Sequence, residues 1–293
     1  MALSAMWDVP APAKLNLFLH VVGRRLDGYH LLQSVFVLID WCDTLHFERR
    51  DDTLLRRHDL GPALPDDDLC LRAARALQSA SGTRLGAEIS VHKRVPWGAG
   101  LGSGSSNAAS TLLALNRLWQ LNWSRERLQP MALALGADVP FFVGGHNAFV
   151  EGIGEGLTPL ALPRQWLAVV KPATALATAA IFSHTQLVRD TCPVIVTDFL
   201  ADAQLVQMRS DGFGRNDLQP PAESLCPEVA RVAEWLMARY GNSRMSGSGS
   251  AVFARAGTGD LPVATWGADE LAPGWVGRMC RSLDHHPLRG WAG

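Results

Sequence analysis

The sequence Pro96-Trp97-Gly98-Ala99-Gly100-Leu101-Gly102-Ser103-Gly104-Ser105-Ser106-Asn107-Ala108-Ala109 lies between an alternating run typical of a strand, 87–95, and an apolar run typical of a buried helix, 108–119. Its four glycines allow positive φ angles and let backbone amides approach a ligand without a Cβ in the way. These amides lie at the positive end of the helix dipole, which favours phosphate. Ser105, Ser106 and Asn107 are expected to cap the helix, and their side chains also suit phosphate or metal contacts. The stretch therefore predicts a strand–loop–helix unit that binds phosphate.

Two familiar nucleotide motifs do not fit this stretch. The Walker pattern requires a lysine that the loop lacks. The dinucleotide pattern G-x-G-x-x-G, started at Gly98 or Gly100, ends on Ser103 or Ser105 where glycine or alanine is needed. The alternative to phosphate binding is a flexible loop before an ordinary capped helix. The high glycine content next to a helix that must be buried favours phosphate binding. A second glycine-serine segment, 245–254, is interpreted either as another anion-facing loop or as a tight turn.

Length and composition limit the classes of protein. A chain of 293 residues is long enough for two domains or one large one, and 47% hydrophobic with 19% charged residues is typical of a globular protein. A net charge of −1 argues against nucleic acid or a membrane surface as partner. The five cysteines are odd in number and scattered, which favours a reducing compartment such as the cytoplasm over a disulfide framework. No run of the length of a membrane span and no signal peptide is expected.

Lysine is rare in this chain, and its positions are informative. Of 27 basic residues, only Lys14, Lys93 and Lys171 are lysines, so each could be kept for a compact point charge. Strand alternation puts Lys14 and Asn16 on one face of a strand. This face either lines a cleft or belongs to an edge strand whose lysine side chain extends to solvent. Asp138 precedes Val139-Pro140 and is expected in a turn, as a partly buried carboxylate that needs a partner. Lys14 is a candidate for that partner, whereas the alternative is a plain turn or cap residue.

Three blocks, 12–16, 96–109 and 245–254, together resemble the GHMP kinase superfamily. The segments 27–30 and 136–142 resemble the branch that acts on a cytidine diphosphate ester of methylerythritol. The resemblance implies a GHMP kinase-like two-domain fold of the α/β class, with α+β two-layer character and the active site in the interdomain cleft. A change of character near 160–164 then divides the chain into an N-terminal ATP-binding domain, 1–160, and a C-terminal domain, 161–293.

The resemblance also implies a reaction and its residues. ATP would donate its γ-phosphoryl group to the 2-hydroxyl of the methylerythritol moiety, a step of isoprenoid precursor synthesis, with Mg²⁺ expected on the phosphates. Lys14 and Asp138 would form the catalytic pair. The expected partners are ATP and the cytidine substrate, and neither nucleic acid nor a membrane is expected. The protein is expected to be a monomer or a homodimer. The residues implied for ATP are Pro96, Trp97, Gly98, Ala99, Gly100, Leu101, Gly102, Ser103, Gly104, Ser105, Ser106, Lys93 and Asp68, and those for the substrate are Asn16, Tyr29, His30, Thr178 and Phe182, with the base between Tyr29 and Phe182.

The chain departs from the family pattern at a few positions. Trp97, Ala99 and Ser103 stand where Met, Gly and Gly are usual, and Asp68 stands where an asparagine is usual near the adenine. Ala99 and Ser103 are compatible with the loop only if their φ angles are negative. Three alternatives remain: a homoserine- or mevalonate-type kinase, a nucleotide-binding regulator without activity, and a nicotinamide dehydrogenase. Tyr29, His30 and Phe182 argue against a homoserine- or mevalonate-type kinase, because a small aliphatic alcohol offers no base for aromatic rings to stack on.

Overall fold

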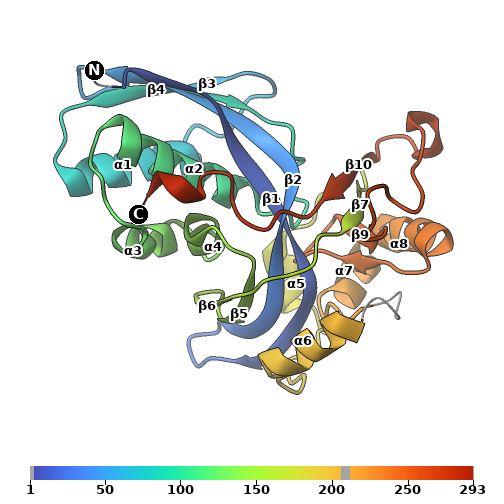
Figure 1. Cartoon of the computed structure of the whole chain (residues 1–293). Helices are drawn as coiled ribbons and strands as arrows, with labels where there is room; N and C mark the ends of the chain where they lie inside the picture. Colours follow the sequence, from blue (N-terminus) through green and yellow to red (C-terminus); the bar gives the residue numbers. More distant parts are fainter. Residues whose placement is uncertain (1–2, 206–211, 293) are drawn as a thin grey trace.

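The computed structural model describes residues 3–205 and 212–292 and is organised around a long antiparallel hairpin (Figure 1). Its strands are β1 (Ala5–Arg24) and β2 (His30–Arg50), and they pair from Ala5 opposite Glu48 to Arg24 opposite His30. Gly28, at a φ of 91°, lies in the connecting turn, as the Asp-Gly pair predicts. The hairpin runs through both halves of the molecule, so it supplies strands to one half and packs against the other.

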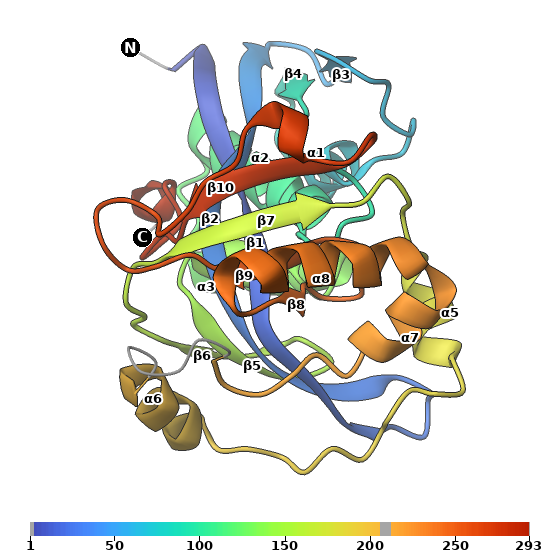
Figure 2. The ribbon, with the colours of Figure 1, turned by 90° about the vertical axis from the view of Figure 1, so that its right-hand side faces the viewer.

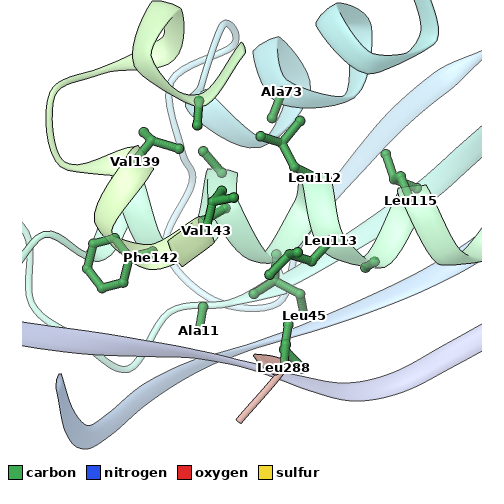
Figure 3. Packing of buried hydrophobic residues seen from close by; sticks show 14 of the residues in the cluster. Ala11, Leu45, Ala73, Leu112, Leu113, Leu115, Val139, Phe142, Val143 and Leu288 are labelled. Atoms are coloured by element: carbon green, nitrogen blue, oxygen red, sulfur yellow. The ribbon is translucent and has the colours of Figure 1, made fainter. Parts of the chain in front are cut away.

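The hairpin belongs to a six-stranded sheet within the described residues, in the order β3-β4-β2-β5-β6 with β1 paired to β2. Helices cover one face of this sheet, and their packing is shown in Figure 3. Successive residues of β2 serve different cores: Leu38 points into the helix-covered core, whereas Val37 and Ile39 point into the core on the other face. The remaining elements of this half are β3 (Leu55–Asp59), α1 (Leu69–Ser81), β4 (Gly86–His92), α2 (Ser103–Leu118), α3 (Arg125–Leu135), α4 (Val139–Gly144), β5 (Ala148–Gly152) and β6 (Gly156–Pro159).

A second sheet, of four strands among the described residues, has the order β10-β7-β9-β8. Helix α8 lies across it in Figure 2, and its apolar side packs into a core with Val170 and Val252. Between the two sheets, Leu15 and Val37 share a core with Leu167. The elements are β7 (Trp166–Lys171), α5 (Thr178–Ser183), α6 (Val196–Leu205), α7 (Gln219–Leu225), α8 (Pro227–Tyr240), β8 (Arg244–Met245), β9 (Val252–Arg255) and β10 (Val276–Arg281). The sequence of residues 198–208 predicts a helix; the structure has α6 there, and residues 206–208 lie outside the described ones.

The prediction of side-chain caps at the start of α2 is wrong. Helix α2 begins at Ser103, five residues before the apolar run, and its N-cap is Gly102, with no side-chain cap. The capping expected from Ser105, Ser106 and Asn107 is absent there because all three already lie within the helix. Asp138 lies in a turn, as expected. This turn leads directly into the short helix α4, because Pro140 falls in the first turn of α4, where a missing N–H and a preset φ favour helix initiation.

The C-terminal segment returns to the first half of the molecule. The two adjacent histidines 285–286 suggest a solvated tail, but His286 is fully buried and its backbone amide donates to Gly145 O at 2.9 Å. Leu288 enters the helix-covered core, and Arg125 donates to its carbonyl at 2.9 Å. The apolar Leu288 side chain and these backbone bonds explain why the segment is buried. The division at residue 160 thus leaves a C-terminal segment in contact with the N-terminal half, and the boundary itself stays a prediction.

Candidate active site

A cleft of about 910 Å³ brings together segments from both halves of the chain. One wall is the inner end of the hairpin, and the floor is the glycine loop. Asp138 and residues of α5 also line it. Of the residues implied for catalysis, ATP and substrate, those that line the cleft are Lys14, Asn16, Tyr29, His30, Pro96, Gly98, Ala99, Gly100, Leu101, Gly102, Ser103, Gly104, Ser105, Asp138, Thr178 and Phe182.

Lys14 and Asp138 meet although 124 positions separate them in the sequence. Lys14 Nζ lies 3.5 Å from Asp138 Oδ2, and the Lys14 side chain is 4% exposed against 31% for Asp138. Nζ also donates to Asn16 Oδ1 at 2.5 Å and lies 4.3 Å from the centre of the Phe36 ring. Burial lowers the pKa of the Lys14 ammonium, and Asp138 opposes that shift. The structure therefore places an ion pair at the edge of the cleft with a carboxylate that reaches solvent.

A chain of hydrogen bonds supports Lys14 from behind. Asn16 Nδ2 donates to Ser34 Oγ at 2.9 Å, and Ser34 Oγ donates to Phe18 O at 2.5 Å. This chain orients the Asn16 amide so that its oxygen faces the Lys14 ammonium. Sequence reasoning missed Ser34 and Phe36, because only the pairing of β1 with β2 brings them near the lysine: Phe36 lies opposite Asn16, and Ser34 lies opposite Leu19.

The glycine loop has the left-handed geometry that its sequence requires. Gly98, Gly100 and Gly102 have φ angles of 57°, 71° and 68°. Ala99 and Ser103 do not occur among the positive-φ residues, so both substitutions relative to the family fit the backbone. Lys14 N donates to Leu101 O at 2.9 Å, which ties the loop to β1.

The second glycine-serine segment braces the first. Ser250 N donates to Gly98 O at 3.1 Å, and Ser246 Oγ donates to Gly100 O at 3.1 Å. A Cβ on Gly100 would lie 2.0 Å from Ser246 O, so no side chain fits there. Of the two interpretations of this segment, the structure favours a tight turn that holds the glycine loop in place, although Ser248 also lines the cleft.

Four residues implied for ATP lie outside the cleft lining. Trp97 is 43% exposed, and Ser106 is fully buried. Lys93 pairs with the buried Asp43 and donates to Ser103 Oγ at 3.1 Å.

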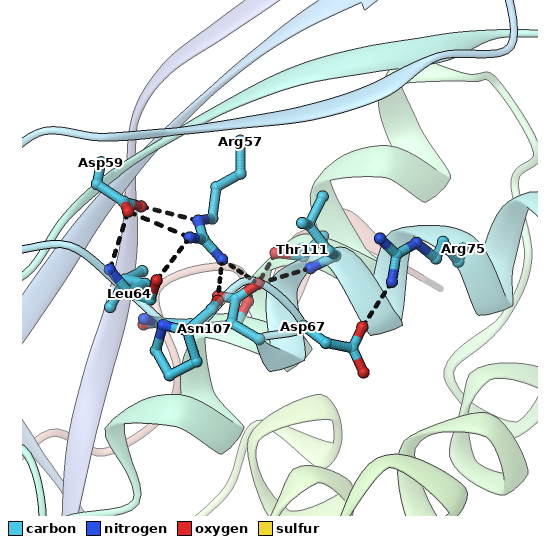
Figure 4. Close-up of polar contacts among 10 residues, drawn as sticks. Arg57, Asp59, Leu64, Asp67, Arg75, Asn107 and Thr111 are labelled. Carbon is cyan, nitrogen blue, oxygen red and sulfur yellow. Dashed lines mark hydrogen bonds and ion pairs between the residues drawn. The ribbon is translucent and has the colours of Figure 1, made fainter.

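Asp68 is occupied by structural contacts. It caps α1 by accepting from Leu71 N at 3.0 Å, and it pairs with Arg57 at 3.1 Å. Arg57 also pairs with Asp59 at 2.8 Å, and Figure 4 shows this network. The aspartate in place of the usual asparagine therefore has a cationic partner of its own.

The far end of the cleft is aromatic. The His30 and Phe182 rings are stacked, with centroids 4.9 Å apart and planes inclined by 27°. Tyr29 is 61% exposed beside them. Thr178 Oγ1 lies 2.8 Å from Ser248 Oγ at the entrance. Tyr29 and Phe182 are thus both available to a base, although one face of Phe182 already contacts His30.

Sequence reasoning missed Arg189, and it marked Lys171 only by the rarity of lysine. Arg189 Nε donates to His30 Nε2 at 3.2 Å, but no local motif marks this arginine. Lys171 is buried and donates to the carbonyl of Pro172 at 2.8 Å, so the third rare lysine fixes the segment that leads to α5. The rarity of lysine marked Lys171 as a residue of interest, but its contacts with the segment before α5 could be known only from the fold.

Comparison with known proteins agrees with this geometry. Residues 68–146 match the family model of the GHMP kinases N terminal domain, and residues 202–262 match that of the GHMP kinases C terminal. A 4-diphosphocytidyl-2-C-methyl-D-erythritol kinase of Methylibium petroleiphilum is 66% identical over 100% of both chains. The chain belongs to the GHMP kinase family, in its 4-diphosphocytidyl-2-C-methyl-D-erythritol kinase branch. Another relative in this branch, from Albidiferax ferrireducens, is 55% identical to this GHMP kinase over 99% of the chain and 96% of the relative.

Solved structures agree with the fold of this GHMP kinase. A 4-(cytidine 5'-diphospho)-2C-methyl-D-erythritol kinase superposes with a TM-score of 0.72 at 36% identity, covering 86% of this chain and 90% of the other. A homoserine kinase from Cytophaga hutchinsonii reaches a TM-score of 0.63 at 16% identity, covering 97% of this chain and 95% of the other, and shows the fold alone. The expected two-domain α/β kinase architecture is confirmed. Among the described residues, no helix has both the length and the apolar character needed to span a bilayer.

Proposed function

We propose that this kinase transfers the γ-phosphoryl group of ATP to the 2-hydroxyl of 4-diphosphocytidyl-2-C-methyl-D-erythritol. The observation that carries the proposal is the Lys14–Asp138 pair, 3.5 Å apart between the glycine loop and an aromatic pocket. The relatives that share 52–66% of its sequence carry the name of this kinase, which supports the same substrate.

In the proposed reaction, Asp138 accepts the proton of the substrate hydroxyl as its oxygen forms a bond to the γ-phosphorus. The bond between that phosphorus and the bridging oxygen breaks, and ADP leaves. Lys14 pairs with the Asp138 carboxylate and offsets negative charge near the transferred group. The amides of the glycine loop at the start of α2 supply fixed donors to the phosphates, since this transfer depends mainly on alignment and charge stabilisation.

Mg²⁺ fits the proposed site as an ion held chiefly by the phosphates of ATP. Ser106 Oγ is fully buried without a hydrogen-bond partner among the described residues, and Ser105 lines the cleft. The described ranges hold no group of three or more His, Cys, Asp or Glu side chains suited to a metal. Few protein ligands are the usual arrangement for Mg²⁺ on a nucleotide. Ser105, which lines the cleft, would contact the ion directly, whereas the buried Ser106 lies outside the lining; the ion would neutralise phosphate charge.

The cytidine moiety would occupy the aromatic end of the cleft, with Tyr29 and Phe182 against the base and Asn16, His30 and Thr178 as polar contacts. Asp68 and Lys93 would support the nucleotide side.

The free cysteines of the described residues are consistent with a cytoplasmic location, which we include in the proposal.

A coupled ATP-turnover assay tests the substrate. The purified protein is given the cytidine diphosphate methylerythritol ester, homoserine or mevalonate at equal concentrations, with Mg²⁺ and ATP. Turnover with the cytidine ester at least a hundredfold above the other two alcohols is expected. Preference for homoserine or mevalonate would refute the proposed substrate, and failure to use any alcohol would favour a regulator without kinase activity.

A further inference from the structure

His30 is held on two sides by residues of the segment that follows β7. The Phe182 ring stacks on its face, and Arg189 Nε donates to its Nε2 at 3.2 Å. The same guanidinium donates to the carbonyls of Phe182 and His184, each at 3.0 Å, and to that of Leu187 at 3.0 Å. Arg189 is thus anchored to the chain that carries Phe182 and reaches from there to the imidazole.

The direction of the Arg189–His30 bond determines where the imidazole carries its proton. A guanidinium has only donors and stays charged, so His30 Nε2 must be the acceptor. A histidine that accepts at Nε2 is neutral and is protonated at Nδ1. Burial lowers the pKa of His30, and the charges of Arg189 and Arg24 lower it further, which agrees with a neutral ring.

We propose that Arg189 is a positioning residue that holds His30 in the neutral tautomer protonated at Nδ1, so that the cytidine pocket presents a donor to an acceptor atom of the base. This inference rests on the proposed function for its ligand, but the tautomer is a property of the free protein. Cytosine offers the acceptors O2 and N3, and only the Nδ1–H form of a neutral His30 clamped by Arg189 can donate to them.

The tautomer is measured directly in the free enzyme. Protein labelled with ¹⁵N-histidine gives two-bond ¹H–¹⁵N correlations that distinguish Nδ1–H, Nε2–H and protonated rings, and His30→Asn assigns the His30 signal among the nine histidines. We expect Nδ1–H in the parent and exchange between tautomers in Arg189→Met. Arg164→Met, which removes an exposed arginine paired with Asp284, is the matched control and should change nothing. An Nε2–H or protonated His30 in the parent would overturn the proposal.

Steady-state kinetics test the consequence for the substrate. In Arg189→Met the KM for the cytidine substrate should rise by roughly three- to tenfold, the inverse of the fraction of rings that keep the Nδ1 proton. The KM for ATP and kcat should stay within twofold of the parent. An unchanged KM for the cytidine substrate despite an altered tautomer would refute the role in recognition.

A double variant separates positioning from simple loss of structure. In His30→Asn the side-chain amide supplies a donor near the place of Nδ1 without needing Arg189 to select a tautomer. Adding Arg189→Met to that variant should then raise KM no further. An equal further rise would show that Arg189 only supports the segment around α5, and would overturn the proposal. If the cytidine ester is not a substrate while Nδ1–H is observed, the proposed function fails and the tautomer assignment stands.

Discussion

Replacing Asp138 with asparagine should lower turnover by orders of magnitude while ATP still binds. The variant keeps the size of the side chain but loses the acceptor for the substrate proton, and general-base catalysis of this kind contributes about 10²–10⁴-fold in rate. The glycine loop is held by a backbone bond to β1 and by the Ser246 hydroxyl, which donates to Gly100 O. Neither contact involves Asp138, so the ATP dissociation constant should change less than threefold.

The same substitution leaves the buried Lys14 ammonium without its counter-ion. At 3.5 Å and an effective dielectric constant near 20, the attraction between the two charges is about 5 kcal/mol before the cost of burying Lys14 is subtracted. Because Asp138 reaches solvent and Lys14 keeps Asn16 and Phe36, we expect a net loss of about 2 kcal/mol in unfolding free energy, below that of a fully buried pair.

Three measurements follow the Asp138→Asn variant: coupled ATP turnover with the cytidine substrate, equilibrium ATP titration and urea unfolding at pH 7. Asp284→Asn, which removes a carboxylate paired with Arg164 on the surface, is the control and should cost less than about 1 kcal/mol with turnover unchanged. Turnover of Asp138→Asn equal to that of the parent would remove Asp138 from the mechanism. Unfolding equal to that of the parent would refute the energetic reasoning about the pair.

Three further outcomes are expected. Gly100→Ala should weaken ATP binding at least tenfold or prevent folding, because its Cβ would lie 2.0 Å from Ser246 O at a φ of +71°. The control Gly104→Ala should be tolerated, because its Cβ meets only a side chain at 3.6 Å. Equal ATP affinities of the two variants would contradict the close approach at Gly100. Tyr29→Ala should raise the KM for the cytidine substrate about tenfold with little change in the KM for ATP, and an unchanged substrate KM would exclude stacking. Burial lowers the pKa of His286 to about 3, so the unfolded state binds the extra proton between pH 3 and 6.5 and stability falls as pH falls through that window. The resulting loss is about 2 kcal/mol at pH 5, and urea unfolding should show a smaller acid slope in His286→Asn; an identical slope in both proteins would refute this origin.

Local chemistry made several elements predictable from the sequence. Asp68 and Ser124 are of the residue types preferred at helix N-caps, and each side chain accepts a backbone N–H bond at the start of its helix. Asp-Gly marked the hairpin turn. The start of α2 and the helix after Asp138 were missed, because serine and proline in the first turn of a helix resemble loop residues when only sequence is considered.

The sequence by itself determined the glycine loop, the kinase resemblance and the candidates Lys14 and Asp138, because short-range spacing and residue type are written into the chain. Only the tertiary structure decided that Lys14 meets Asp138, that Ser34 orients Asn16 and that Arg189 reaches His30. These contacts join residues from separate elements, and their distances depend on how the strands pair and the helices pack. No local pattern encodes such distances, since they result from burying many apolar side chains at once.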